Sequence, residues 1–168
     1  LATAFLQQFY RDVAPADLME RDPLDLYGAA LALLRFGETR MPGEPRLRAY
    51  NPRLEQHGWQ SPHTIVEIVN DDMPFLVDSV GMELSRHGIG VHLIIHPVLA
   101  VRRDAAGKIE ALGSTEALPD GAAVRSGERR VALVIGNGAY AHAARLDNPV
   151  RDALLLAIHV FPDHPDPS

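Results

Sequence analysis

A short acidic turn, Asn70-Asp71-Asp72-Met73-Pro74, is the clearest candidate binding site in the sequence. It follows a β-branched apolar run and precedes a helical pattern, so it is expected at a helix N-terminus. Free N–H groups and the positive dipole end there favour a carboxylate. Asp71 and Asp72 could hold an ammonium, so the turn predicts a site for a zwitterionic amino-acid effector. The alternative is that Asp72 only caps the helix and Asp71 faces water, because Asp prefers caps for local reasons.

Histidine and serine side chains offer weaker candidates for chemistry. His92 and His96 are four residues apart on a strand-like segment, hence on one face, where imidazoles can bind Zn²⁺. No carboxylate or thiolate stands at a clear ligand spacing from them. We therefore expect these histidines to be ordinary residues of a sheet and not metal ligands. Ser79 and Ser85 lack the G-x-S-x-G surroundings of a hydrolase nucleophile. We therefore predict no catalytic residue and no metal ligand in this chain.

A glycine pattern near the C-terminus is similar to a dinucleotide-binding motif. Residues 136–141 read GNGAYA, which matches G-x-G-x-x-A after the apolar run 131–135. The next helical pattern begins only near Asn148-Pro149, about ten residues later than a dinucleotide site requires, and no second strand follows to carry the ribose-binding acid. The sequence thus predicts a tight turn at residues 136–138 and no cofactor-binding residue.

Hydrophobic periodicity places these candidates on a series of expected elements. Asp22-Pro23 pairs an N-cap with a first-turn proline, which predicts a helix over residues 23–37 after a shorter helical pattern at 1–11. A helix from Pro74, with Asp72 or Met73 at its cap, is expected to close at the left-handed Gly88. Strands are expected at residues 46–50, 63–69, 91–102 (with Pro97 at an edge or bulge) and 108–112.

The order strand, helix, strand, strand predicts an α+β fold. It corresponds to the front half of a ferredoxin-like βαββαβ unit, an antiparallel sheet with helices on one face. We expect an N-terminal helical segment at residues 1–45, the βαββ unit at 46–112, and a linker or junction at 113–130, where Gly, Ser, Pro and Asp are frequent.

Composition limits the class of protein. The 168 residues are enough for one domain with a core, and 46% of them are hydrophobic. The formal net charge of −6 argues against a nucleic-acid partner and gives no attraction to anionic lipid. No apolar run reaches the length of a membrane span, so no membrane partner is expected. The absence of cysteine excludes disulfides and a thiolate nucleophile within these residues, and is compatible with the cytoplasmic location that we expect.

Two longer segments resemble a known enzyme family. YNPRLEQHGWQSPHTIVEIVNDDMPFLVDSV and VHLIIHPVLAVRRDAAGKI are similar to the N-terminal region of the large bacterial NAD-dependent glutamate dehydrogenases. The resemblance covers roughly residues 1–112, and the run NDDMPFLVDS is its most specific part. It implies an ACT-like regulatory or assembly module, far upstream of a catalytic domain that performs oxidative deamination of glutamate to 2-oxoglutarate.

That resemblance implies where the chemistry of the parent enzyme would reside. The family's catalytic lysine and aspartate and its dinucleotide-binding glycines lie in parts absent from this chain. The resemblance therefore implies NAD as a cofactor of the parent enzyme only, with the remaining domains of that enzyme and further copies of it as partners. The expected role of this chain is regulation or assembly, without catalysis.

The last forty residues resemble a different family. RRVALVIGNGAYAHAARLDNPVRDALLLA, at residues 129–157, is similar to the opening strand, loop and helix of bacterial caspase-like peptidases. The catalytic His and Cys of that family come later in its domain, so this resemblance implies an inactive fragment or a hybrid open reading frame as the alternative interpretation. We expect residues 131–168 to form a strand–helix fragment whose strand at 131–135 and helix at 150–161 could complete the sheet.

Overall fold

The computed structural model describes residues 1–113 and 129–137. Within these residues the helices and strands follow one another along the chain in this order: α1 (Ala2–Phe9), α2 (Pro15–Met19), α3 (Pro23–Phe36), β1 (Arg46–Tyr50), α4 (Leu54–His57), β2 (Thr64–Asn70), α5 (Leu76–Arg86), β3 (Leu93–Ile95), β4 (Val98–Arg103), β5 (Ile109–Gly113) and β6 (Arg129–Asn137). The α+β class predicted from the sequence is confirmed.

The N-terminal helices form for the local reasons that the sequence indicated. Asp22 caps α3 by accepting a hydrogen bond from the Leu24 backbone N–H at 2.7 Å, and Pro23 occupies the first turn, where its missing N–H costs nothing. In α1, Phe5 and Phe9 are one helical turn apart, are buried and stack with ring centroids 5.4 Å apart. The predicted helices at 23–37 and 1–11 are therefore confirmed, the second in slightly shorter form.

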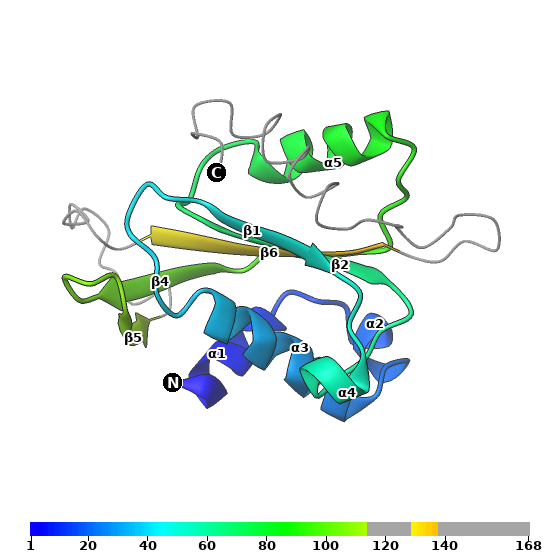
Figure 1. The fold of residues 1–168 in the computed structure, drawn as a ribbon, viewed down its shortest axis with the longest axis horizontal. Helices are drawn as coiled ribbons and strands as arrows, with labels where there is room; N and C mark the ends of the chain where they lie inside the picture. Colours follow the sequence, from blue (N-terminus) through cyan, green and yellow to red (C-terminus); the bar gives the residue numbers. More distant parts are fainter. Residues whose placement is uncertain (114–128, 138–168) are drawn as a thin grey trace.

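The strands form one antiparallel sheet in the order β1-β2-β6-β4-β5, with β3 also pairing with β6. Because β2 and β4 are both antiparallel to β6, they are parallel to each other, and α5 connects them around the intervening strand. This is the split βαβ arrangement of a ferredoxin-like fold. In Figure 1, β6 runs through the middle of the sheet between these neighbours.

The position of β6 corrects the predicted βαββ unit. The segment around residues 108–112 was expected to be the third strand of the unit, but as β5 it pairs only with the outer side of β4 among the described strands. The central third position belongs to β6, which pairs with all seven residues of β2. Gly136 and Asn137 lie within β6, so the tight turn predicted at 136–138 does not begin where expected. The strand at 131–135 does join the sheet, and the helix expected at 150–161 lies outside the described residues.

The predicted long strand at residues 91–102 is instead two strands. β3 ends at Ile95 and β4 begins at Val98, and both pair with β6 in turn. The intervening Pro97 has no N–H to donate to the ladder, which explains the interruption.

Helices cover both faces of the sheet (Figure 1). On one face, Val66 and Ile68 of β2 belong to the core cluster that contains residues of α5. A helix packed on this face is what the ferredoxin-like unit predicts. On the other face, Ile65 and Val69 belong to a cluster with residues of α1 and α3. The prediction of helices on a single face therefore holds only for the βαβ unit, because the N-terminal helices cover the second face. Every residue of β2 is buried as a result.

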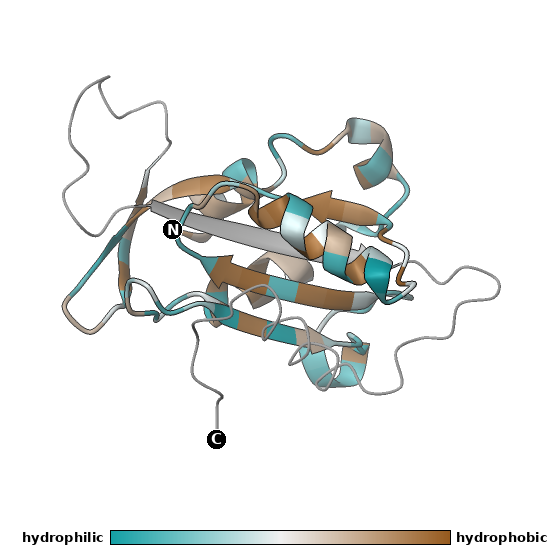
Figure 2. Ribbon diagram, turned by 90° about the horizontal axis from the view of Figure 1, so that it is seen from above, coloured by the Kyte–Doolittle hydropathy of each residue, from teal (hydrophilic) through white to brown (hydrophobic). Residues whose placement is uncertain are grey.

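Helix α5 starts later than predicted. It begins at Leu76, and neither Asp72 nor Met73 caps it, because the N-cap position is occupied by Phe75 in the left-handed conformation (φ 63°). Met73 precedes a proline, which disfavours helical backbone at that residue. The predicted left-handed closure at Gly88 is confirmed by its φ of 69°. Figure 2 looks onto this helix and shows apolar and polar residues alternating along it.

None of the helices in the described ranges is both long and apolar enough to span a bilayer.

Candidate functional site

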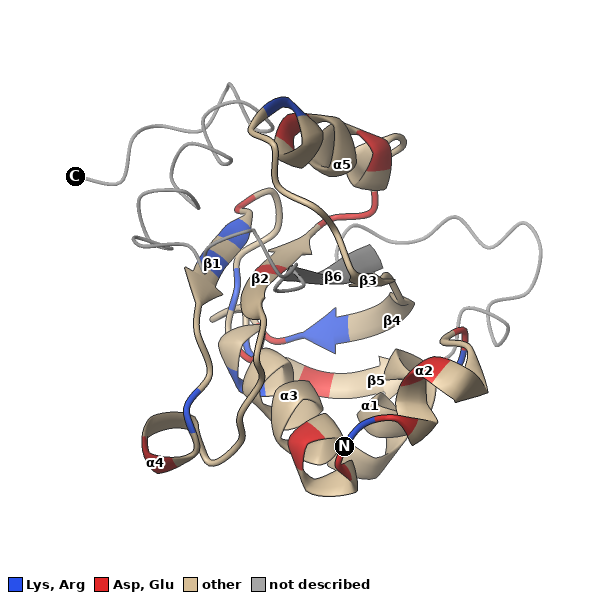
Figure 3. Ribbon diagram, turned by 90° about the vertical axis from the view of Figure 1, so that its right-hand side faces the viewer, with Lys and Arg blue, Asp and Glu red and all other residues tan. Residues whose placement is uncertain are grey.

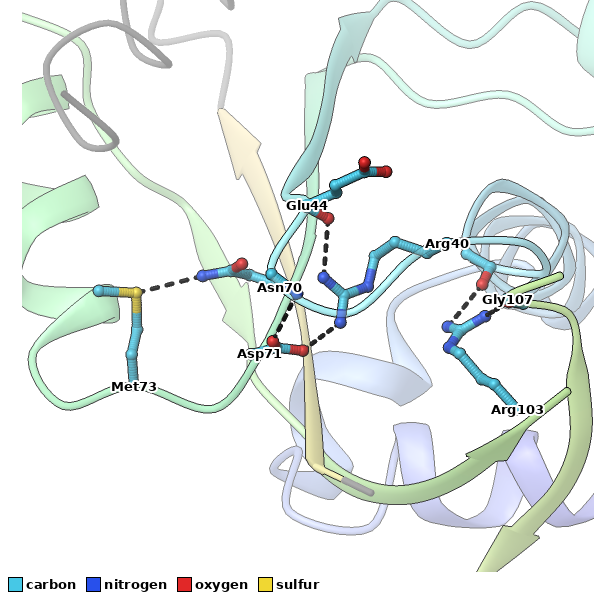
Figure 4. Close-up of polar contacts among 9 residues, drawn as sticks. Arg40, Glu44, Asn70, Asp71, Met73, Arg103 and Gly107 are labelled. Atoms are coloured by element: carbon cyan, nitrogen blue, oxygen red, sulfur yellow. Dashed lines mark hydrogen bonds and ion pairs between the residues drawn. The ribbon is translucent and has the colours of Figure 1, made fainter. Parts of the chain in front are cut away.

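The predicted site lies at the C-terminal end of β2, where Figure 4 shows its polar contacts. Asn70 is the last residue of the strand and is buried, with 7% of its surface exposed. Its side-chain amide donates to the Met73 Sδ at 3.1 Å. This contact folds the turn back onto the end of the strand, so Asn70 positions the turn.

Asp71 joins the turn to a distant loop. One carboxylate oxygen forms an ion pair with Arg40, whose side chain is completely buried, and the other accepts a hydrogen bond from the Gly43 N–H at 2.9 Å. Arg40 also donates to the backbone oxygen of Glu44 at 2.7 Å. Asp71 therefore neutralises a buried cation, and it does not simply face water as the alternative sequence interpretation supposed (Figure 4).

The other predicted site residues lie at the surface. Asp72, Met73 and Pro74 are exposed, and so is Phe75, which separates them from the first turn of α5. The structure therefore brings Asn70 and Asp71 into the body of the protein and leaves Asp72 as the accessible carboxylate of the group. The helix N-terminus lies beyond Phe75, further along the chain than the sequence indicated.

Arg40 is the residue that sequence reasoning missed. It stands just before the Met-Pro-Gly break after α3, and a single arginine beside a turn carries no sign of burial. Arg103 is placed in a comparable way beneath the same loop, and it donates to the backbone oxygens of Gly37 and Gly107 at 2.8 and 2.7 Å. Two guanidinium groups thus hold the chain that connects α3 to β1, with Asp71 as the carboxylate partner of the first.

A second polar group lies on the face of the sheet that α1 and α3 cover. Glu67 of β2 is directly opposite Arg48 of β1 and forms an ion pair with it, and the Tyr50 hydroxyl donates to the same carboxylate at 2.8 Å. Burial raises the pKa of Glu67, while Arg48 and Tyr50 act in the opposite direction. Burial and the neighbouring carboxylate also raise the pKa of Tyr50, so its hydroxyl remains a donor. The group fixes β1, β2 and α3 together, since Arg48 also donates to the Ala32 oxygen at 3.1 Å.

The predicted histidine pair is not assembled as a metal site. His92 lies against His63, with ring centroids 4.8 Å apart, and His96 follows β3 at the interruption before β4. Within residues 1–113 and 129–137 there is no group of three His, Asp or Glu side chains arranged to hold a metal ion. Of the glycine motif at 136–141, Gly136 and Asn137 are paired in β6, and the rest lies outside the described residues.

Comparison with known proteins identifies the family. The family model described as "Glutamate dehydrogenase, ACT1 domain" matches residues 5–135 and so extends through most of β6. A NAD-specific glutamate dehydrogenase from Halomonas elongata is 46% identical over 112 residues, covering 67% of this chain and 7% of the relative. One from Pseudomonas aeruginosa is 39% identical over 144 residues, covering 86% of this chain and 9% of the relative. The chain thus spans less than a tenth of the length of these curated relatives.

No solved structure matches the chain with significance. The family match covers most of the sequence, including the acidic turn, the N-terminal helices and the central strand. The chain therefore belongs to the glutamate dehydrogenase ACT1 domain family.

Proposed function

We propose that this chain is the N-terminal regulatory or assembly module of an NAD-dependent glutamate dehydrogenase and performs no catalysis itself. The observation that carries the proposal is the family match over residues 5–135, together with relatives whose printed activity is NAD-specific glutamate dehydrogenase. The parent enzyme would oxidise glutamate to 2-oxoglutarate with NAD bound elsewhere. Its remaining domains and further copies of the enzyme are the proposed partners, and a cytoplasmic location stays a prediction of the sequence.

The proposed effector site is the turn formed by residues 70–74. Asp72 is its exposed carboxylate and would take the ammonium of an amino acid, while Asn70 and the Arg40–Asp71 pair hold the backbone of the turn. Asp71 supports this site as a positioning residue because both of its oxygens are engaged. The proposal therefore places ligand contact on the surface side of the turn.

Thermal denaturation with a panel of amino acids tests the effector site. A ligand at a hundredfold excess over its Kd stabilises the folded state by about 2.7 kcal/mol, so the melting temperature should rise with one or more amino acids. Asp72→Asn should abolish that rise, whereas Asp78→Asn, which removes an exposed carboxylate from the first turn of α5, should preserve it. If no amino acid raises the melting temperature, the module does not bind an amino-acid effector and only the assembly role remains.

The absence of catalysis is tested separately. The chain incubated with glutamate and NAD should form no NADH, because the catalytic residues of the family lie outside the region that it spans. Turnover by the purified chain would overturn this part of the proposal.

The alternative that the sequence resemblance suggests is a caspase-like origin for residues 129–157. The resemblance of VALVIGNGAY favours it. The family match reaching residue 135 and the pairing of β6 between β2 and β4 support a glutamate dehydrogenase origin for the first part of that segment instead. DNA sequence read continuously across codons 113–130 and beyond Ser168 would distinguish the two, since it shows which frame continues.

A further inference from the structure

A cavity of about 330 Å³ lies on the face of the sheet that α1 and α3 cover, at the end of β2 opposite the acidic turn. It is lined by residues 20–22, which join α2 to α3, by α3 itself, by the segment before β2 and by the segment that contains strand β3. Its apolar wall is formed by Tyr10, Leu26, Ala29, Trp59, Ile65 and Ile95. With β2 rising about 3.3 Å per residue, about 17 Å separate the lining residue Ile65 from Asn70. It is therefore distinct from the proposed effector site.

The wall of the cavity is built around Trp59. The side chain is 3% exposed, and its position is set by Gly28 of α3, where a Cβ would lie only 2.4 Å from the Trp59 Cβ. Tyr50 lies edge-on to the indole with ring centroids 6.2 Å apart. A cavity of this size with an apolar wall and a few polar groups at its mouth is typical of small-molecule sites.

The mouth of the cavity is acidic. Glu20, Asp22 and Asp25 line it against one guanidinium, that of Arg21. Figure 3 shows acidic positions on α3, the helix that carries Asp25. One oxygen of Asp25 accepts from the Gln60 N–H at 2.9 Å, and Asp22 is engaged as the cap of α3. The imidazoles of His63 and His92 also line the cavity, with ring centroids 4.8 Å apart.

We infer that this cavity binds a small amphipathic amine, with its apolar body against Trp59 and its ammonium beside Asp25. Three carboxylates against one guanidinium favour a cation and disfavour a dicarboxylate such as glutamate. Asp25 is the carboxylate that best fits the role, because it is half-buried and the Gln60 hydrogen bond fixes its orientation. The inference does not depend on the proposed function, since no residue of the acidic turn contributes to the cavity.

Intrinsic fluorescence provides a local readout, because Trp59 is the single tryptophan of the chain. The 168-residue chain is titrated with three probes of similar shape: 2-phenylethylamine, 2-phenylethanol and 3-phenylpropanoate. The amine should change Trp59 fluorescence saturably and should bind several-fold more tightly than the alcohol. The carboxylate should bind weakest. Equal affinity for amine and carboxylate, or no saturable response to the amine, would overturn the inference.

Variants then test the residues named. Asp25→Asn keeps an acceptor for Gln60 and removes the charge, so the Kd for 2-phenylethylamine should rise about fivefold, as for an ion pair at a partly exposed site. Asp78→Asn removes the same charge from α5, on the opposite face of the sheet, and should leave the Kd within about twofold. Ala29→Leu should reduce the affinity for both amine and alcohol by filling the cavity. Equal effects of Asp25→Asn and Asp78→Asn would show that only the net charge matters and would refute the assignment of Asp25.

Discussion

At the scale of single residues, Gly28 has the clearest steric requirement in the protein. It lies in the middle of α3, where glycine is normally unfavourable, and the backbone there passes directly beneath the Trp59 side chain. The close approach of helix and indole explains why a helix interior keeps a residue without a Cβ. It also links α3 to the segment before β2.

Gly28→Ala should lower the free energy of unfolding by about 1–3 kcal/mol, because its Cβ would overlap Trp59. The matched control is Gly81→Ala in α5, where an added Cβ meets no atom within 4 Å. That change should stabilise by about 0.5–1 kcal/mol through helix propensity. Urea denaturation of both variants measures the difference, and equal effects would contradict the proposed packing.

Glu67 shows how a buried charge connects strands and helix. Its pKa is raised by burial, so the folded state binds a proton more readily than the unfolded state. Stability from this group is therefore fully present below the unfolded pKa and is lost as pH rises through the folded pKa.

Glu67→Gln should remove that dependence. The unfolding free energy of the wild type should fall relative to that of the variant as pH rises above the unfolded pKa of Glu67, because only the wild type must bury an ionised carboxylate. Denaturation of both proteins at several pH values between about 4 and 8 measures this difference. A constant difference across the range would show that Glu67 ionises as easily in the folded protein as in the unfolded chain.

At the scale of elements, the Arg40–Asp71 pair anchors the loop before β1 to the end of β2. The arginine is fully buried and the aspartate is about one-third exposed, so removing the carboxylate leaves a cation without its partner inside the protein. The acidic turn thus holds two segments of the chain together and is also the proposed effector site.

Asp71→Asn should destabilise the protein by about 3 kcal/mol, the typical result of breaking a buried ion pair from one side. Asp72→Asn, one residue along, should change stability by less than about 0.5 kcal/mol because that side chain is exposed. Thermal or chemical denaturation compares the two. If Asp72→Asn is the more damaging change, the assignment of the two carboxylates is reversed.

At the scale of the whole molecule, β6 unites the sheet. It pairs with β2, β3 and β4, so without it the split βαβ unit has a gap between its two parallel strands. The amides of β6 should therefore exchange with solvent as slowly as those of β2. Hydrogen exchange across the full chain measures this, and rapid exchange of residues 131–137 would contradict the central position of the strand.

Truncation tests the same point. A chain ending at residue 113 should lose cooperative unfolding, because the edges of β2 and β4 that face β6 would be left unpaired. A chain ending at residue 137 keeps every strand of the described sheet and should retain a cooperative transition. Equal transitions in the two would mean that β6 contributes little to the fold.

The sequence by itself determined the local elements and the family. Caps, prolines and periodicity act over a few residues, so α3, the strand at β2 and the left-handed Gly88 could be predicted from neighbouring residues. The NDDMPFLVDS run was specific enough to indicate the family. The α+β class followed from the order of the elements.

Only the tertiary structure decided which residues share a site. The burial of Arg40 against Asp71, the place of β6 between β2 and β4, and the cavity beside Trp59 each join segments far apart in the chain. The sequence carries no local sign of such contacts, because strand pairing and the burial of a charge depend on long-range packing. For the same reason the sequence could predict that a turn follows the strand at β2, while the ion pair of Asp71 with Arg40 could not be predicted.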